Sequence, residues 1–175
     1  MEQLIMNWRN DGSEAKMPEF PAGVELVTLP QLPDGVAHWL DIIRFMGKTE
    51  SPETPYKVFE DSLLKWPDYD ENLCFFLTVD GVPAATLTVI CHREKGQGYV
   101  HMVACKPTFR GRGLGNLLSR LAAFVLLREG MQTAYLTTDD WRIPAIKTYL
   151  RAGFVPDTES QPDFRERWEN VLSQI

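Results

Sequence analysis

A run of glycines and arginines at residues 110–116, Arg-Gly-Arg-Gly-Leu-Gly-Asn, has the composition of a loop that binds a charged ligand. An apolar, β-prone stretch (99–105) precedes the run, and a strongly helical stretch (116–128) follows it. A helix that begins after such a turn leaves its first N–H groups unpaired at the positive end of its dipole. Arginine adds charge and forked donors, and glycine lets a ligand touch the backbone because no Cβ stands in the way. The pattern therefore predicts a phosphate-binding loop.

Three known patterns compete for this run. The dinucleotide fingerprint Gly-x-Gly-x-x-Gly, counted from Gly111, needs a glycine where the chain has Asn116. The nucleotide P-loop ends in Gly-Lys-Ser/Thr, and no such tripeptide follows. The third pattern, Arg/Gln-x-x-Gly-x-Gly/Ala after a strand, is met by Arg110, Gly113 and Gly115. A plain tight turn between a strand and a helix is the simplest alternative.

Through this third pattern the chain resembles the GNAT acetyltransferase superfamily. The resemblance implies a GNAT-like α/β (α+β) fold, with a central mixed, twisted sheet of about six to seven strands flanked by helices. It covers about residues 73–156 well, and the N-terminal half only by the order of its elements. It also implies that the pyrophosphate of acetyl-CoA is held by Arg110, Gly111, Arg112, Gly113, Leu114, Gly115 and Asn116.

A second motif supports the resemblance. Family members commonly carry Asn-x-x-Ala-x-x-x-Tyr-x-x-x-Gly-Phe downstream of this loop. The chain matches that spacing at Ala145, Tyr149 and the Gly153-Phe154 pair. It departs at the first position, where Arg142 replaces an asparagine that often touches the coenzyme. Arg142 is therefore a candidate coenzyme contact, with a solvent-facing arginine as the alternative.

The resemblance further implies where acetyl transfer takes place. The strand that ends at Cys105 is expected to splay from its neighbour. Backbone N–H groups of Val103, Ala104 and Cys105 then bind pantetheine and polarise the acetyl carbonyl. Tyr149 is the expected acid that protonates the leaving thiolate, and a tyrosine that only packs against a helix face is the alternative. We expect direct transfer within a ternary complex.

The acceptor amine has to be neutral before it can attack. An amine like that of lysine, with a pKa of ≈ 10.4, is neutral in about one of ~2,500 molecules at pH 7, which is equivalent to ~4.6 kcal/mol. A general base or a water chain must offset this cost. Because strand side chains alternate, Tyr99 and His101 are expected on the same face as Val103 and Cys105. His101 is the candidate catalytic base, since imidazole titrates near neutral pH, and Tyr99 or a water chain are other candidates. A half-buried histidine without a catalytic role is the simpler alternative for His101.

Other polar residues near these motifs have simpler interpretations. Cys105 could accept the acyl group, but no histidine is placed by sequence to activate it, so a small buried thiol is favoured. Asp139, Asp140 and Trp141 follow a predicted strand. They either line the acceptor cleft or cap the next helix.

Hydrophobic periodicity and turn residues predict the elements that position these groups. Strands are predicted at residues 24–29, 73–79, 82–91, 99–105, 133–138 and 154–155. Helices are predicted at 33–47, 56–65, 116–128, 144–153 and 164–175, with a loop at 48–55. The order matches the GNAT layout, except that a helix follows where many relatives have a last strand. We expect an N-terminal arm (1–22) that docks, with a short extra strand as one way to do so. A GNAT-like domain (23–160) and an amphipathic helix packed on it (161–175) complete the chain.

Composition argues against several classes of protein. The 175 residues suffice for one domain, and the net charge of −6 argues against a nucleic-acid partner. Cys74, Cys91 and Cys105 are odd in number and lie in apolar runs, which indicates free thiols in a reducing compartment. No signal peptide, membrane-spanning segment or zinc-ligand spacing is recognisable. We therefore expect a cytoplasmic protein without a metal or a membrane partner.

Together these observations predict an acetyl-CoA-dependent N-acetyltransferase whose acceptor is an amine, with a small molecule favoured over a protein. A non-catalytic acyl-CoA-binding or sensing module with the same fold is the alternative, because Arg142 replaces the asparagine and no carboxylate base is evident. Transfer to oxygen, or of a longer acyl chain, is a third interpretation. The sequence does not identify the acceptor, and it is compatible with a homodimer.

Overall fold

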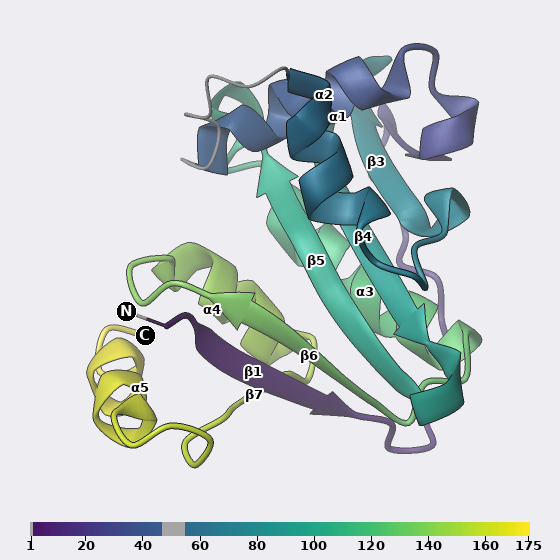
Figure 1. Ribbon diagram of the computed structural model, residues 1–175. Helices are drawn as coiled ribbons and strands as arrows, with labels where there is room; N and C mark the ends of the chain where they lie inside the picture. Colours follow the sequence, from purple (N-terminus) through teal and green to yellow (C-terminus); the bar gives the residue numbers. More distant parts are fainter. Residues whose placement is uncertain (1, 47–54) are drawn as a thin grey trace.

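The computed structural model describes residues 2–46 and 55–175, which are built around a twisted seven-stranded sheet (Figure 1). The strand order is β2-β3-β4-β5-β6-β1-β7, and neighbours are antiparallel except for the parallel pair β5–β6. The strands are β1 (Leu4–Arg9), β2 (Val24–Thr28), β3 (Cys74–Val79), β4 (Val82–His92), β5 (Gln97–Cys105), β6 (Thr133–Thr138) and β7 (Val155–Pro156). The mixed sheet predicted from the sequence is confirmed.

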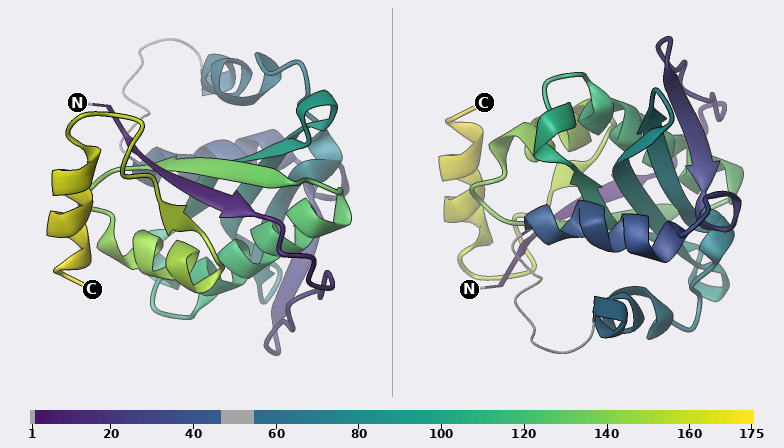
Figure 2. Two further views of the ribbon diagram at one scale, coloured as in Figure 1. Left: turned by 90° about the horizontal axis from the view of Figure 1, so that it is seen from below. Right: turned by 90° about the horizontal axis from the view of Figure 1, so that it is seen from above.

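Helices cover both faces of this sheet (Figure 2). They are α1 (Gly35–Ile43), α2 (Pro55–Phe59), α3 (Leu114–Arg128), α4 (Ile143–Arg151) and α5 (Phe164–Leu172). The first two lie on one face, α3 and α4 on the other, and α5 lies beside α4. A π-helical segment (Glu60–Leu64) continues α2. The predicted helix end at Gly47 and most of the predicted loop 48–55 lie outside the described residues. Within the described chain, no helix has the length and apolarity needed to cross a membrane.

The first strand of the chain is an internal strand of the sheet. β1 pairs with β6 along its whole length, from Leu4 opposite Thr138 to Arg9 opposite Thr133, and with β7 on its other side. Its apolar side chains Leu4, Met6 and Trp8 alternate along the strand and are buried. The N-terminal segment thus contributes to the core, and its first residues lie close to α5 (Figure 1).

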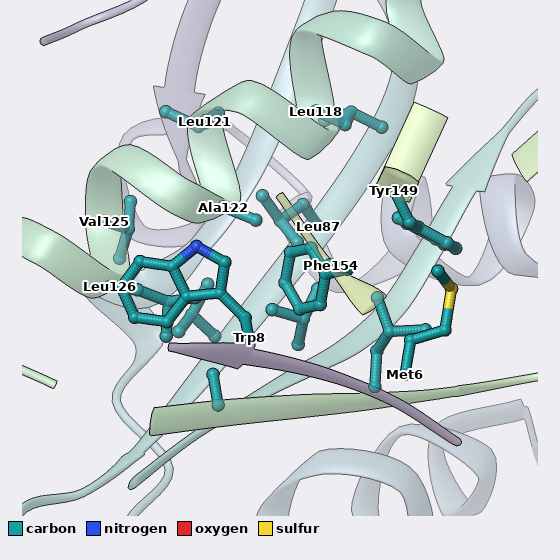
Figure 3. Close-up of a cluster of buried hydrophobic side chains, with 14 of the residues drawn as sticks. Met6, Trp8, Leu87, Leu118, Leu121, Ala122, Val125, Leu126, Tyr149 and Phe154 are labelled. Atoms are coloured by element: carbon teal, nitrogen blue, oxygen red, sulfur yellow. The ribbon is translucent and has the colours of Figure 1, made fainter. Parts of the chain in front are cut away.

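The sheet separates two hydrophobic cores. The larger core lies under α3, α4 and α5, and Figure 3 shows part of it, with Met6, Trp8, Leu118, Tyr149 and Phe154. α3 contributes many of its apolar side chains, as expected from a helix that is apolar nearly all round. The smaller core lies under α1 and α2. Each face of the sheet is therefore buried independently of the other.

A β-bulge in β5 reverses which residues share a face. Thr88 of β4 pairs with His101, but Thr86, two residues earlier, pairs with Ala104, so β5 has one residue more than its partner. The bulge contains Met102, whose φ of 53° lies in the left-handed region that non-glycine residues rarely adopt.

The expectation that Tyr99 and His101 share a face with Val103 and Cys105 is therefore wrong. Val103 and Cys105 pack against the larger core, whereas His101 pairs with Thr88, whose hydroxyl contacts Cys74 of the smaller core. Simple alternation fails because the extra residue at the bulge shifts the side-chain period by one.

Candidate functional site

The two parallel strands at the centre of the sheet separate partway along their length. β5 and β6 are paired from Gln97 opposite Thr133 to Val100 opposite Leu136. Beyond that point β5 continues to Cys105 and β6 to Thr138 without pairing, and the ribbons diverge (Figure 1). A cleft of about 760 Å³ opens at this divergence, within the size range of small-molecule sites. The expected splay of the strand ending at Cys105 is thus present.

The glycine-rich loop forms one wall of this cleft. Gly111 and Gly113 have φ values of 77° and 79°, and a Cβ on either would meet nothing within 4 Å. Gly113 is the residue before α3, and the first backbone bond of the helix runs from Leu117 N to Gly113 O, at 3.1 Å. No side chain caps this helix end in the described residues. The N–H groups of Leu114, Gly115 and Asn116 are therefore available to an anion.

The cleft is cationic although the whole chain is acidic. Arg110, Arg142 and Arg151 line it, and its described lining includes no aspartate or glutamate. Arg110 donates from Nε to the carbonyl oxygen of Cys105 at 3.3 Å, which ties the loop to the end of β5. Arg112, also predicted to contact the coenzyme, lies outside the lining, with its guanidinium 5.3 Å from the centre of the Phe109 ring. The field of the cleft therefore favours an anionic ligand.

The free edge of β5 forms a second wall. The N–H of Lys106 donates to Ala84 O at 2.9 Å, on the β4 side. Because backbone groups of successive strand residues point to opposite edges, those of Val103 and Cys105 point toward the gap left by β6. Val103, Ala104 and Cys105 all line the cleft. The structure thus brings the predicted backbone donors and the glycine-rich loop into one cavity.

Tyr149 of α4 lines the cleft as well. The residue is 7 % exposed and borders both the cleft and a second, smaller pocket. Burial raises the pKa of Tyr149 to about 12, and the nearby positive charge of Arg142 acts in the opposite direction. At pH 7 the hydroxyl is therefore fully protonated and can donate a hydrogen bond or a proton.

Arg142 does not face solvent. It lines both the cleft and the smaller pocket, its Nε lies 2.8 Å from Asp139 Oδ2, and Nη2 donates to Met46 O at 3.3 Å. Its guanidinium also lies 4.7 Å from the centre of the Trp141 ring. The residue that replaces the family's asparagine is therefore held in the cleft by contacts from two elements.

The smaller pocket, of about 60 Å³, lies in the gap between β5 and β6. Tyr99, His101, Thr138 and Tyr149 border it, and the buried hydroxyl of Thr138 has no partner among the described residues. This volume has room for water, and the lining is polar enough to hydrogen-bond to it. His101 Nε2 lies 3.0 Å from the carbonyl oxygen of Ser62, so in the neutral imidazole this nitrogen carries the proton. Only Nδ1 could then act as a base.

The structure also places the other candidates named from the sequence. Cys74, Cys91 and Cys105 are free thiols, and burial raises the pKa of each. Asp140 accepts two hydrogen bonds from Arg167, and Asp139 pairs with Arg142. Among the described residues, no group of three or more His, Cys, Asp or Glu side chains could hold a metal ion.

Sequence reasoning missed some of the cleft's lining. Met46 follows α1, and α4 contributes the half-buried Thr148 and the exposed Arg151. Thr148 could have been found, because it directly precedes Tyr149 in the recognised motif. Met46 had no local signal, since its approach to the cleft depends on how α1 packs on the sheet.

Comparisons with known proteins agree with this architecture. A family model described as "Acetyltransferase (GNAT) family" matches residues 37–154. The mycothiol acetyltransferase of Streptomyces avermitilis is 28% identical over 146 residues, which cover 76% of this chain and 47% of that protein. Human N-alpha-acetyltransferase 30 is 27% identical over 120 residues, covering 67% and 32%. The chain spans about half the length, or less, of these curated relatives.

Solved structures show the same fold. A GCN5-related N-acetyltransferase from Sphaerobacter thermophilus superposes with a TM-score of 0.64 at 22% identity, covering 90% of this chain and 50% of that one. The ribosomal-protein-S18-alanine N-acetyltransferase from Escherichia coli gives 0.60 at 20% identity, covering 77% and 79%.

Gly113→Asn tests the phosphate loop. Asparagine tolerates the left-handed backbone better than other side chains, so the fold should survive, but its side chain would fill the open space where an anion approaches. We predict that calorimetry gives a Kd for acetyl-CoA raised about ten-fold or more, because hydrogen bonds to charged groups contribute ~1.5–3 kcal/mol each.

Gly130→Asn is the matched control. Gly130 lies just beyond the C-terminal end of α3, with a φ of 72°, and a Cβ added to it would meet nothing within 4 Å, but it does not line the cleft. Equal affinity in both variants would contradict the assignment of the loop.

Proposed function

The chain belongs to the GNAT acetyltransferase family, and we propose that it transfers the acetyl group of acetyl-CoA directly to an amine within a ternary complex. The observation that carries this proposal is the continuity of one cleft, which joins the unpaired N–H groups of α3, the free edge of β5 and Tyr149. These three parts match the three needs of the reaction, which are an anchor for phosphates, donors for an oxyanion and an acid for the thiolate.

The reaction follows from this arrangement. The amine nitrogen attacks the thioester carbon, and the N–H groups of Val103 and Cys105 stabilise the negative charge that develops on the carbonyl oxygen. The C–S bond then breaks, and the Tyr149 hydroxyl gives its proton to the sulfur. The buried hydroxyl of Tyr149 is protonated at neutral pH, so it has a proton to give.

The acceptor we propose is a small-molecule amine. Five of the similar proteins are mycothiol acetyltransferases, which supports a small-molecule acceptor. Other relatives are N-alpha-acetyltransferases, so a protein N-terminus is the competing acceptor. His101, or water in the small pocket beside it, accepts the proton of the amine. Free thiols support a reducing compartment such as the cytoplasm.

An amine panel tests the proposed function. Release of CoA thiol is measured with acetyl-CoA and an amino sugar, a dipeptide with a free α-amine, a lysine-bearing peptide or a diamine. We expect acetyl-CoA to bind saturably and at least one small amine to give the highest kcat/KM. Tight binding of acetyl-CoA with no thiol release above the enzyme-free rate for any amine would contradict the proposal and favour the non-catalytic module.

Tyr149→Phe tests the proton donor. Removing the hydroxyl should lower kcat at least ten-fold, since general acids typically contribute about 10²–10⁴-fold. The Kd for acetyl-CoA should change by no more than about two-fold, because ground-state binding is retained. Tyr135→Phe is the control, since Tyr135 is a half-buried tyrosine whose pKa is also raised but which does not line the cleft. Unchanged turnover in Tyr149→Phe would remove the assignment.

His101→Gln tests the base. If the imidazole takes the proton, the rise of kcat/KM with pH that accompanies its deprotonation should disappear, because glutamine at this position does not titrate. The sign follows from the role, since a base is inactive when protonated and gains activity as the pH rises. A pH–rate profile identical to that of the unaltered chain would assign the step to water.

A further inference from the structure

The turn between β6 and α4 (residues 139–142) carries two adjacent carboxylates, and each is held by an opposite end of the chain. Gln3, just before β1, donates from Nε2 to Asp139 Oδ1 at 2.9 Å. Arg167, on α5, binds Asp140. The same turn carries Trp141 and Arg142, which line the cleft. The two termini therefore converge on one short segment of the candidate site.

Arg167 binds Asp140 with both sides of its guanidinium fork. Nε donates to Oδ2 at 3.0 Å and Nη2 to Oδ1 at 2.5 Å. Nη2 also donates to the carbonyl oxygen of Glu2 at 3.0 Å, and Nη1 to Asp163 Oδ2 at 3.2 Å. The Arg167 side chain is only 11 % exposed, and its hydrogen bonds hold the pKa of the Asp140 carboxyl below its usual range. Two-point contacts of this kind set orientation as well as distance.

Asp139, next to Asp140, connects the turn to an arginine of the cleft. Asp139 accepts from Gln3 and pairs with Arg142 Nε at 2.8 Å. Arg142 in turn stands beside Tyr149 closely enough for its charge to oppose the rise in the tyrosine's pKa. Asp139, the ion-pair partner of Arg142, is next to Asp140 in the chain. A shift of the Asp140 backbone therefore also moves the carboxylate that holds Arg142. The contacts thus run from α5 through the turn to Arg142, which lines the cleft.

We propose that Arg167 is a positioning residue, which places Arg142 in the acetyl-CoA cleft by clamping Asp140 of the β6–α4 turn. The inference rests on the proposed function, because its readout is the binding of acetyl-CoA. Arg167 is not part of the described cleft lining, and neither are its hydrogen-bond partners Asp140, Asp163 and Glu2, so we expect it to act through the turn.

The docking of α5 does not depend on this arginine. Phe164, Trp168 and Val171 are at most 1 % exposed and hold the helix on the larger core. Loss of the guanidinium should therefore loosen the turn while α5 stays docked. Two measurements therefore distinguish a positioning role from a folding role. The thermal unfolding temperature shows whether α5 stays docked, and the Kd for acetyl-CoA shows whether the turn is held.

The same helix offers a matched control. Arg165, two residues earlier, pairs with Glu159, and both side chains are largely exposed. Exposed ion pairs contribute little to stability, and this one is remote from the turn. Arg165→Gln removes the same charge from the same helix without touching Asp140.

The experiment is a double-mutant cycle on the full chain, with the Kd for acetyl-CoA measured by calorimetry. We expect Arg167→Gln to raise the Kd about five-fold or more, within the range of ~2–30-fold that couplings between sites typically reach. We expect Arg165→Gln to leave it unchanged. In an Arg142→Gln background, Arg167→Gln should have little further effect, because its route to the ligand is already gone.

Asp140→Asn is the second variant, because it removes the two-point ion pair and leaves Arg167 bonded to Asp163 and Glu2. It should raise the Kd for acetyl-CoA as Arg167→Gln does. The inference is overturned if Arg167→Gln and Asp140→Asn bind as tightly as the unaltered chain, or if the effects of Arg167→Gln and Arg142→Gln simply add. If the unaltered chain itself does not bind acetyl-CoA, it is the proposed function that fails.

Discussion

The rest of the site depends on one constraint, which is that β5 is paired with β6 over only half of its length. Backbone N–H and C=O groups in a protein interior need partners, so a strand that leaves its neighbour must find others. On the far side of the divergence, β5 presents the groups of Val103 and Cys105 to a cleft instead of to a strand. In the proposed function, the amide and thioester groups of acetyl-CoA would pair with this edge in the way that an added strand does.

The charge of the cleft lining is opposite in sign to the net charge of the chain. The chain has a net charge of −6, yet its cleft is lined by arginines and by no described carboxylate. The carboxylates of the adjoining turn, Asp139 and Asp140, are each committed to an arginine. Whole-chain charge therefore says nothing about the local field that a phosphate-bearing coenzyme would experience.

Local patterns predicted much of the fold and of the glycine-rich loop. The glycines at 111 and 113 were recognisable because left-handed backbone favours glycine, and the spacing from Ala145 to Phe154 follows from one helix and its exit. The bulge at Met102 had no such signal, because methionine does not favour a positive φ, and so the face of His101 was predicted wrongly. The internal place of β1 and the contact between Arg167 and Asp140 are also non-local. They join segments far apart in the sequence, and periodicity within one segment cannot reveal them.

The most direct test of a coenzyme site at this divergence compares acetyl-CoA with S-acetyl-pantetheine in calorimetric titrations of the unaltered chain. Both carry the thioester and the amides that β5 would pair, but only acetyl-CoA carries the diphosphate that the start of α3 would hold. We predict saturable binding of acetyl-CoA, with the truncated thioester weaker by about ten-fold or more, since charge-assisted hydrogen bonds contribute ~1.5–3 kcal/mol each. Equal affinity for the two compounds, or no binding of acetyl-CoA, would contradict a diphosphate site at the start of α3.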